Sequence, residues 1–586
     1  MRRVICHAPL NVLVIEPWQN GQTLKQAIAR LILFLFKTTI RPMDNQRLIL
    51  FIVFSFSLLL LWEAWQDKNA PPPLPPSAVS SPAAQSVPTP SQGLNAPVSA
   101  PASAQTGFVK GQRALVETDV LHAVIDANGG DLRQLKLLPY RETDNRDQVF
   151  TLFEDNQITP YMAQSGLIGK NLPTHRSQYQ INPGTYRLTG GAAQVEVPMV
   201  WNDPATGVRV EKTYIFKRGS YEIGVRTRVI NGSTQPIDLT PYYQLTRHGE
   251  PPRGSTFFLP TYTGIAVYTD AKKFQKIPFK KIPEGKAEFE KTADNGWVGM
   301  VQHHFVSAWL PEGSVKREFY VRDTDGVYSA GVMLAEGMLA PGQQKTFTVP
   351  LYAGPQTQTV LEQTAPGLDL ARDYGWLTPL AYPIFWALEK IERIVGNWGW
   401  AIIILTIFLK LALYPLSAAG YKSMAKMKKL TPRLQKLKET YGDDRAKLHQ
   451  AMADMYKTEK INPLGGCLPI LIQIPVFIAL YWVLLAAVEM RGAPWIGWIT
   501  DLTSPDPWFI LPIIMGITSV LQVKLNPQPM DPMQAKIMMI MPVMFTVMFV
   551  FFPAGLVLYW VVNNILSIAQ QWWINKQVEG ARAVKV

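Results

Sequence analysis

The sequence predicts a polytopic α-helical membrane protein with six transmembrane helices and a large antiparallel β-sandwich domain outside the membrane. Three observations lead to this prediction. The 586-residue chain collects its apolar residues into a few long runs, and the run from Ile537 to Ile574 contains no charged side chain. A bilayer requires such a run, whereas a soluble core does not. Lys and Arg gather beside these runs, and a long central region instead alternates polar and apolar residues.

The charge of the chain fits a membrane better than a nucleic acid. A net charge of +13 and an isoelectric point near 9.4 suggest nucleic-acid binding only when the basic residues form a footprint on a folded domain. Here they lie beside apolar runs, where the positive-inside rule accounts for them. We therefore predict no dedicated nucleic-acid target. The two cysteines, Cys6 and Cys467, lie outside the central region, which must fold without a disulfide.

Residues 43–66 are predicted to form an N-terminal transmembrane anchor. The run Leu48–Trp62 comes after basic residues and precedes Glu63, and this charge order keeps the N-terminus in the cytoplasm and exports the chain beyond the anchor. A cleaved signal peptide is the alternative, because the run is short. Trp65 at the far edge favours an uncleaved anchor with an aromatic belt.

Residues 67–106 are predicted to be a linker. Positions 70–106 include ten Pro, seven Ser and eight Ala, and no charge occurs between Lys68 and Lys110. A segment of this composition cannot bury a core, so we expect a semi-extended, disordered spacer.

From 107 to 371 the pattern changes to short alternating runs bounded by turn residues. Apolar and charged side chains alternate from Glu222 to Val229, and Asn231-Gly232 comes next as a turn. The stretch Val208–Phe216 repeats the alternation. This pattern predicts one large antiparallel β-sandwich on the outer side of the membrane.

Residues 372–397 contain a predicted amphipathic helix. Ile384, Phe385 and Leu388 recur at helical spacing, and charged residues around Glu389 take the other side. A helix of this kind just before a span is typical of the membrane interface. The alternative is a core helix of the sandwich.

Residues 398–578 are predicted to form a five-helix core. The loop 420–462 has eleven Lys or Arg against five acids, whereas the only base in the loop 489–507 is Arg491, so the first loop is cytoplasmic. Alternation then gives six spans, with both chain ends and the tail 579–586 in the cytoplasm. The five spans of the core are Trp398–Ala419, Leu464–Val488, Trp508–Val523, Ile537–Phe552 and Ala554–Ile574.

The cytoplasmic loop 420–462 is predicted to be a basic helical hairpin. Apolar residues recur at steps of three and four from Met427 to Tyr441 and from Leu448 to Met455, on either side of a turn at Gly442. The basic residues are either a solvated face or a contact to anionic lipid or ribosomal RNA. Those at its start are Lys422, Lys426, Lys428, Lys429 and Arg433.

Catalytic motifs are scarce. The sequence contains no Gly-Lys-Ser/Thr phosphate loop, no His-Glu-x-x-His and no Gly-x-Ser-x-Gly. His303-His304 adjoins Phe305 and Trp309 on an alternating run, which favours a strand over a metal site. We therefore expect no catalytic residues, no metal and no cofactor.

Lys410 is the only charged residue within the five core spans. It lies about twelve residues, or roughly 18 Å, from either edge of its stretch. A charge at that depth costs roughly 2.5 to 3.5 kcal/mol, so we expect Lys410 to face a hydrated cavity or a partner. Snorkelling toward the cytoplasm is the alternative. Because the spans contain no acid, Lys410 is available to an incoming acidic group.

Several short motifs together resemble one known family. They are Met43-Asp-Asn-Gln-Arg47, Gly396-Asn-Trp-Gly399, Tyr414-Pro-Leu416, Ser423-Met-Ala-Lys-Met427, Asn462-Pro-Leu-Gly-Gly-Cys-Leu-Pro469, Asp531-Pro-Met533 and Phe552-Pro-Ala-Gly-Leu-Val-Leu-Tyr559. In this order they resemble the YidC family of membrane protein insertases of Gram-negative bacteria. The likeness covers about 43 to 578 and is most specific in the C-terminal third.

The resemblance implies a protein of the bacterial inner membrane with a periplasmic β-supersandwich and a hydrophilic groove among five helices. It implies nascent membrane proteins as substrates, and the Sec translocon, the ribosome and membrane lipids as partners. The family usually has Arg where Lys410 stands, and often Tyr where Trp560 stands. The residues assigned to the substrate groove are Thr406, Lys410, Gln473, Tyr559 and Trp560.

Residues 1–42 match nothing in the family, so we interpret them as an extension from a mis-assigned start codon, with Met43 as the true initiator. Two other classes of protein stay open. A solute transporter would normally show repeats among its spans. An anchored carbohydrate-binding or epimerising enzyme would need paired acid and base groups in the sandwich.

Overall fold

The computed structural model describes residues 87–88, 110–142, 145–250, 262–441, 444–459, 468–526 and 532–583. The predicted extension 1–42 and the anchor 43–66 lie outside the described residues. Apart from residues 532–538, all described residues belong to one compact unit.

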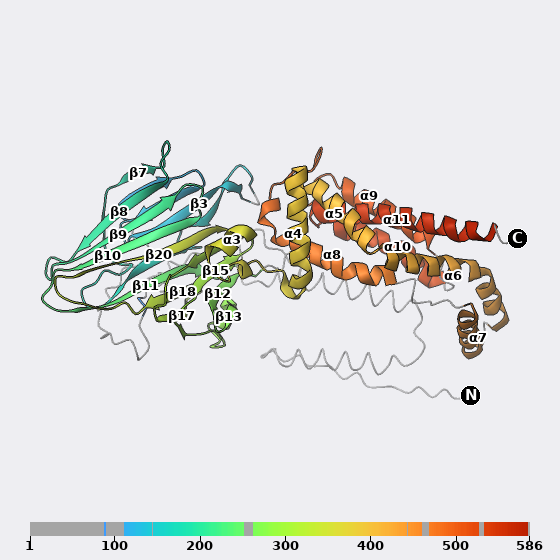
Figure 1. Cartoon of the computed structure of the whole chain (residues 1–586), viewed down its shortest axis with the longest axis horizontal. Coiled ribbons are helices and arrows are strands. Elements are labelled where there is room, and N and C mark those ends of the chain that lie inside the picture. The colour runs from blue at the N-terminus through green and yellow to red at the C-terminus, as the bar shows by residue number, and fades with distance from the viewer. Residues whose placement is uncertain are drawn as a thin grey trace, which may run out of the picture. The chain divides into compact units, whose positions relative to one another are not determined.

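Two β-sheets form the first large part of the described chain (Figure 1). One sheet has 11 strands in the order β14-β17-β18-β11-β5-β3-β2-β1-β7, with β19 beside β11 and β4 beside β3. Its strands are β1 (Arg113–Glu117), β2 (Leu121–Asp126), β3 (Asp131–Arg141), β4 (Val149–Phe153), β5 (Tyr161–Ile168), β7 (Gly184–Arg187), β11 (Ile237–His248), β14 (Thr292–Ala293), β17 (Arg317–Thr324), β18 (Val327–Leu334) and β19 (Gly337–Leu339).

The other sheet has 9 strands in the order β13-β12-β15-β16-β20-β10-β9-β8-β6. These strands are β6 (Gln180–Ile181), β8 (Gln194–Asn202), β9 (Val208–Lys217), β10 (Glu222–Asn231), β12 (Gly264–Thr269), β13 (Lys273–Ile277), β15 (Trp297–Gln302), β16 (Phe305–Trp309) and β20 (Gln344–Pro355).

The predicted antiparallel β domain is confirmed, with one exception to the strand direction. The ladders that join neighbouring strands are antiparallel, as for β9 with β10 and β10 with β20, but β1 and β7 pair in parallel. The core lies between the sheets: Leu135 and Val332 of the first sheet share an apolar cluster with Phe216, Val225 and Leu351 of the second. Burying such side chains is the main stabilising term for a domain without disulfides.

The alternating stretch from Glu222 to Val229 forms β10, in which Ile223, Val225 and Val229 are fully buried. The turn after it does not close a hairpin, because β10 pairs with β9 and β20, whereas the next strand, β11, belongs to the other sheet. Buried Asn231 fixes this change of sheet, since its side-chain amide donates hydrogen bonds to the carbonyl oxygens of Gln235 and Leu339, both at 2.9 Å.

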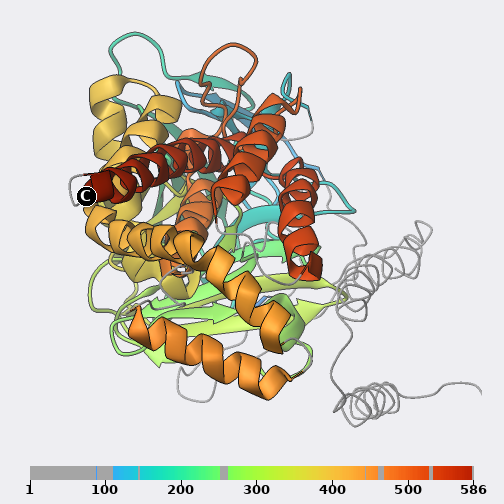
Figure 2. The ribbon, with the colours of Figure 1, turned by 90° about the vertical axis from the view of Figure 1, so that its right-hand side faces the viewer.

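Helices form the rest of the described chain, and Figure 2 shows the C-terminal helix α11 in dark red. This helix contacts α5, α6, α8 and α9. The helices are α3 (Gln358–Thr364), α4 (Thr378–Val395), α5 (Trp398–Ala412), α6 (Tyr414–Tyr441), α7 (Arg445–Thr458), α8 (Leu468–Ala486), α9 (Ile510–Leu525), α10 (Pro532–Phe549) and α11 (Ala554–Ala583). Short 3₁₀ turns are η2 (Phe279–Lys281), η3 (Asp369–Ala371), η4 (Gly375–Leu377) and η6 (Val488–Met490).

The lengths of the helices differ from the predicted spans. In the described part of the chain, no single helix combines the length and the apolar composition needed to cross a membrane. One pair passes the same criteria together, α5 with residues Tyr414–Leu430 of α6, and it is bent by 68°. Shorter apolar stretches are Gln473–Ala486, Ile510–Leu525 and Ala535–Phe549.

The prediction of one continuous helix from 398 to 419 is wrong, because the chain breaks at Leu413 between α5 and α6. Pro415 accounts for the break: it has no N–H to donate to the carbonyl of Leu411, and its ring crowds that turn. Lys410 therefore lies in the last turn of α5 and not in the middle of a straight helix.

Helix α4 packs on other helices. Ala381, Phe385 and Leu388 are buried in an apolar cluster with residues of α5 and α8, so the alternative of a core helix of the sandwich is wrong. On the other side Trp386 is 55% and Ile394 87% exposed, which leaves an apolar face available to a lipid interface.

The basic hairpin consists of α6 and α7, which contact each other. Helix α6 starts well before Met427, and Pro432 stays inside it. The ion pair between Arg433 and Glu459, 2.7 Å from Nη1 to Oε1, joins the two helices near the end of α7.

Candidate functional site

The motif Gly396-Asn-Trp-Gly399 sets the position of α5. Gly396 ends α4 with a φ of 68°, a left-handed conformation that glycine adopts without strain. Asn397 then caps α5, because its side chain accepts a hydrogen bond from the N–H of Trp400 at 3.2 Å. Gly399 is required for a different reason: a Cβ atom there would lie 2.2 Å from the ring of Trp495.

Lys410 and Thr406 lie one turn apart on α5 and are both buried. The ammonium group of Lys410 donates a hydrogen bond to the hydroxyl oxygen of Ser567 on α11 at 2.7 Å. Ser567 in turn donates to the carbonyl oxygen of Asn563, also at 2.7 Å. The hydroxyl of Thr406 donates to the carbonyl of Ile402 in its own helix at 2.7 Å. Among the described residues, no acidic side chain forms an ion pair with Lys410.

Gln473 and Tyr559 form the second polar contact of the site. The side-chain amide of Gln473 on α8 donates a hydrogen bond to the hydroxyl of Tyr559, which is 1% exposed on α11. Trp560, the next residue, lies elsewhere: its ring packs edge-on against Phe477, with centroids 4.8 Å apart, and against Phe549. The structure thus brings Tyr559 and Gln473 together and places Trp560 in an aromatic cluster.

Helix α11 carries two polar faces. Tyr559, Asn563 and Ser567 recur at intervals of four residues, which places them on one face toward α5 and α8. Asn564 lies on the other face and donates to Ser519 of α9 at 2.9 Å. Gln571 continues this second face with a bond to Asn526 at 3.0 Å. The first face is the candidate functional site and the second joins α11 to α9.

Ser567 is a site residue that the sequence prediction missed. A lone serine inside an apolar run gives no periodic or charge signal, so its role is visible only from the contact with Lys410. The one hint in the sequence was spacing, because Ser567 comes eight residues after Tyr559 and so shares its helix face.

The basic residues predicted for the hairpin form no compact cluster with Lys410. The side chains at 422, 426, 428, 429 and 433 are all exposed along α6, whereas Lys410 is buried in α5. The buried residues of α6 instead join this helix to α11, because Tyr421 and Met424 pack against Ile574. The exposed basic residues are thus a separate surface.

The loop between α8 and α9 is organised by two buried aspartates. Asp501 accepts hydrogen bonds from the N–H groups of Gly492 and Thr503 and pairs with Arg146 of the β domain at 2.7 Å. Asp506 accepts from the N–H of Leu511 at 2.7 Å and so caps the start of α9. This loop also holds the start of α11: the N–H groups of Ala554 and Gly555 donate to carbonyl oxygens of Ser504 and Leu502.

Further contacts join the end of α8 to the β domain, and the start of the same loop to the segment before α4. The guanidinium of fully buried Arg372 pairs with Glu489 at 2.9 Å and stacks 4.0 Å from the ring centroid of Phe385. His303 and His304 both hydrogen-bond through Nε2 to the carbonyl oxygen of Leu485, at 2.9 and 2.7 Å. The described residues contain no group of three or more His, Cys, Asp or Glu that could hold a metal ion.

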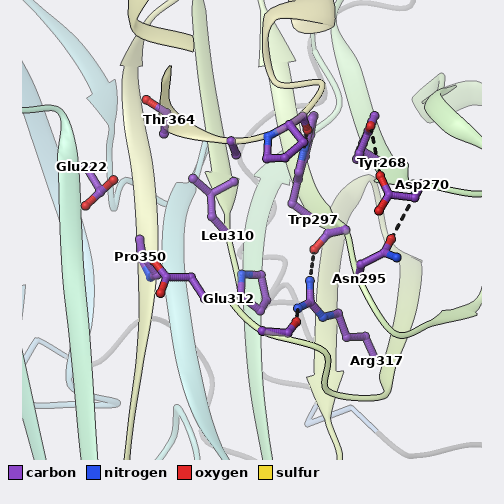
Figure 3. Close-up of a pocket in the computed structure, with 15 residues that line it drawn as sticks. Glu222, Tyr268, Asp270, Asn295, Trp297, Leu310, Glu312, Arg317, Pro350 and Thr364 are labelled. Atoms are coloured by element: carbon purple, nitrogen blue, oxygen red, sulfur yellow. Dashed lines mark hydrogen bonds between the residues drawn. The ribbon is translucent and has the colours of Figure 1, made fainter. Parts of the chain in front are cut away.

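A pocket of about 280 Å³ lies in the β domain, lined among others by Glu222, Asp270 and Arg317 (Figure 3). Glu222 and Asp270 lie on opposite sides of the pocket (Figure 3). Arg317 donates to the carbonyl oxygens of Gly296 and Gly313, so its charge supports two loops.

The described chain therefore combines an antiparallel β domain with a set of apolar helices around a buried lysine, an arrangement expected of a membrane protein with a large domain outside the bilayer. Comparison with known families specifies the class. Residues 113–387 match the model of the YidC periplasmic domain, and residues 390–581 match that of the 60Kd inner membrane protein. The chain belongs to the YidC family of membrane protein insertases of the bacterial inner membrane.

Curated relatives agree with this assignment. A membrane protein insertase YidC from Thiobacillus denitrificans is 80% identical over 92% of this chain and 98% of its own length. One from Dechloromonas aromatica is 54% identical over the same shares of the two chains. The predicted function, membrane protein insertion, is confirmed at the level of the family, which is one of insertases and not of catalytic enzymes.

Two solved structures are similar to lesser degrees. The crystal structure of an active YidC insertase with its first transmembrane domain resolved is 21% identical, covers 79% of this chain and 92% of its own, and gives a TM-score of 0.38. A galactose mutarotase related enzyme from Lactobacillus acidophilus is 11% identical, covers 41% of this chain and 97% of its own, and gives a TM-score of 0.26. At these scores neither likeness adds to the assignment.

Proposed function

We propose that this chain inserts apolar segments of nascent membrane proteins along the face of α11 that carries Tyr559, Asn563 and Ser567, and that Lys410 attracts the acidic flank of the entering segment. The observation that supports this proposal is the partner of Lys410. A buried lysine normally pairs with an acid, but here the hydrogen-bond partner is the neutral hydroxyl of Ser567 at 2.7 Å. The positive charge therefore remains available to a carboxylate.

The energy of insertion comes from the substrate. Moving a segment of about 20 apolar residues from water to lipid is favourable, whereas moving its polar flank is costly. Hydrogen-bonding groups along the proposed path replace part of the hydration of that flank and lower the barrier. Thr406, Gln473 and Tyr559 are the other polar residues that we assign to the path. We also assign Trp560 to it, as an aromatic contact and not as a hydrogen-bonding group.

We propose six membrane spans, with the β domain in the periplasm and both chain ends in the cytoplasm. Apolar side chains exposed on the helices support their contact with lipid, and the positive-inside rule supports their orientation. Ile513 and Ile517 of α9 and Val543 and Val547 of α10 are each more than half exposed, which water would penalise and lipid would not. A bent pair such as α5 and α6 fits a path at which the bilayer is locally interrupted.

The basic surface of α6 suggests the partners of the protein. Lys422, Lys426, Lys428 and Lys429 are exposed in a part of the chain that the positive-inside rule places in the cytoplasm. We propose that this surface receives substrates from the ribosome or contacts anionic lipid, and that the protein works alone or with the Sec translocon.

A reconstitution tests the proposal. The purified protein in liposomes, with one small single-span substrate and no other component, should insert that substrate, and Lys410→Glu should reduce insertion of a substrate with an acidic tail. A solute transporter or a sugar-modifying enzyme would leave insertion at the level of empty liposomes. Equal insertion by the two proteins would contradict the proposed role of Lys410 and leave the family assignment intact.

A further inference from the structure

One short piece of the Pro/Ser/Ala linker contacts the β domain. Within the linker, Val87 and Pro88 belong to the described residues, and Pro88 is buried while Val87 is half-buried. The guanidinium of Arg322 on β17 donates a hydrogen bond to the carbonyl oxygen of Val87 at 3.1 Å. The prediction of a disordered spacer therefore does not hold at this dipeptide, and the rest of 67–106 lies outside the described residues.

The surface beneath Val87 is the face of the 11-stranded sheet that points away from the sandwich core. Val87 packs against Tyr242, Tyr320 and Met333, which share this face by strand register. Their sequence neighbours Tyr243, Phe319 and Val332 point the other way and belong to the main core. We name Ile168, Tyr242, Tyr320, Arg322 and Met333 the outer patch.

The outer patch is built in advance of any ligand. Tyr320 lies opposite Gly331 and Tyr242 opposite Gly166, and a Cβ atom at either glycine would lie 2.4 or 2.6 Å from the tyrosine hydroxyl. The glycines thus let both rings lie flat across the neighbouring strands. Tyr320 is fixed further by donating a hydrogen bond to the side-chain oxygen of Gln244 at 2.8 Å.

A Val-Pro dipeptide suits this patch chemically. The residue before a proline is biased toward extended or polyproline II backbone, and proline has no N–H that would need a partner when buried. The carbonyl oxygen of Val87 accepts its hydrogen bond from Arg322. The guanidinium also stacks 5.3 Å from the ring centroid of Tyr320, so its position is fixed before it binds.

We propose that the outer patch is a binding site for a polyproline II segment, and that its occupant is the Val87-Pro88 segment of this chain. Tyrosine rings with one fixed donor are the usual means of recognising such segments. Anchoring at Val87 divides the linker into two tethers. The 20 residues from 67 to 86 then reach about 60 Å at about 3.1 Å per residue, half the reach of the whole 40-residue linker 67–106.

Nitroxide labels test this proposal in the full-length protein in liposomes, after Cys6→Ser and Cys467→Ser remove the native thiols. One label replaces Thr89, beside the anchor, and a control label replaces Ser99 in the same linker. We expect slow, restricted motion at Thr89 and fast motion at Ser99. Val87→Lys should free the label at Thr89, because it places a positive charge on the tyrosines and beside Arg322, and the matched change Val98→Lys should not.

Arg322→Ala gives an independent second test, because it removes the donor and leaves the linker sequence intact. It should raise the mobility at Thr89 and leave the label at Ser99 unchanged. Fast motion at Thr89 in the unmodified linker would overturn the proposal, and so would slow motion that survives both Val87→Lys and Arg322→Ala. Slow motion at both labels would overturn the division into two tethers.

Discussion

The ammonium group of Lys410 and the hydroxyl of Ser567 are hydrogen-bonded at 2.7 Å across the contact between α5 and α11. This bond holds a positive charge in place without neutralising it. An acidic residue in the position of Ser567 would hold the lysine equally well and would remove its attraction for a substrate carboxylate. A serine at position 567 is thus consistent with a function in which the positive charge of Lys410 stays available to a substrate carboxylate.

Exchanging Ser567 separates these two roles. Ser567→Asp should form an ion pair with Lys410 and reduce insertion of substrates with acidic tails. Ser567→Asn differs from the aspartate variant only in charge and should insert these substrates nearly normally. Ser567→Ala should cost about 1 to 3 kcal/mol of stability, because it leaves a buried donor without its partner. Insertion measured in vivo at matched expression checks the series. Equal insertion by Ser567→Asp and Ser567→Asn would contradict a role for the free charge.

For insertion of substrates with acidic tails, the sign of the charge at position 410 should matter more than which side chain carries the charge. Lys410→Arg should keep function, Lys410→Ala should show an intermediate defect, and Lys410→Glu should fail for acidic tails because like charges repel. One pair of charges about 4 Å apart contributes about 1 kcal/mol in water and about 4 kcal/mol near a protein surface, so the defect should grow with each acid.

The measurement for this series is insertion of one small substrate that carries zero, one or two acidic residues in its translocated tail. Lys422→Glu, an equal charge change on the exposed surface of α6, is the matched control and should not follow the number of tail acids. If Lys410→Glu and the unmodified protein insert all three substrates equally, Lys410 is an anchor that reaches toward the cytoplasm and nothing more.

The hairpin of α6 and α7 should act in delivery and not in the folding of the core. Deleting residues from Lys426 to Lys457 removes exposed basic side chains but keeps the contacts of Tyr421 and Met424 with Ile574. We expect a folded protein that inserts ribosome-delivered substrates more slowly. Thermal unfolding checks the first statement and co-translational insertion the second. A normal rate would show that the hairpin is a solvated connector.

The sequence predicted those features that repeat locally. Alternation identified β9 and β10, and the long apolar runs and basic loops identified a membrane protein. It did not predict the break at Leu413, because a single proline competes there with an otherwise continuous apolar run. Nor did it predict contacts between distant segments, such as Lys410 with Ser567 or Val87 with Arg322. Such contacts depend on tertiary packing, which leaves no period in the sequence.

The same limit applies to the change of sheet after β10. A Gly-containing turn between two alternating stretches favours a hairpin, and local signals do not distinguish a hairpin from a crossing to the other sheet. The two bonds that Asn231 donates to Gln235 and Leu339 decide the outcome, and the second of these joins residues 108 positions apart.

Residues 1–42 should be dispensable. If translation starts at Met43, the intact mass of the native protein will lack these residues, and a version that begins at Met43 will insert substrates at the normal rate. Mass spectrometry of the protein from its native organism checks the first statement. A peptide from Gln22 to Arg30 in that sample would show that the extension is translated.

The contact of His303 and His304 with Leu485 should weaken in acid. Burial, then repulsion from His303 and Arg491, holds the pKa of His304 well below the ordinary value of 6.5, and burial likewise lowers the pKa of His303. The folded protein thus binds fewer protons than the unfolded chain. The stabilisation is fully present above pH 6.5 and is lost as the pH falls below that value.

Hydrogen exchange, corrected for the intrinsic effect of pH, should therefore show the end of α8 and the turn from β15 to β16 opening more often at pH 5 than at pH 7.5. In the double variant His303→Gln/His304→Asn, the free energy of opening these segments should be lower by about 1 to 3 kcal/mol at both pH values. The variant should show no additional acid sensitivity in these segments. Asparagine is chosen at 304 because the residue there has a φ of 66°, which asparagine tolerates.

His122→Gln, at a histidine on β2 of the other sheet, is the control and should keep the acid response. An acid response that the double variant retains in full would assign it to other groups, of which His248, whose pKa is lowered to about 4 mainly by burial, would be the first to examine.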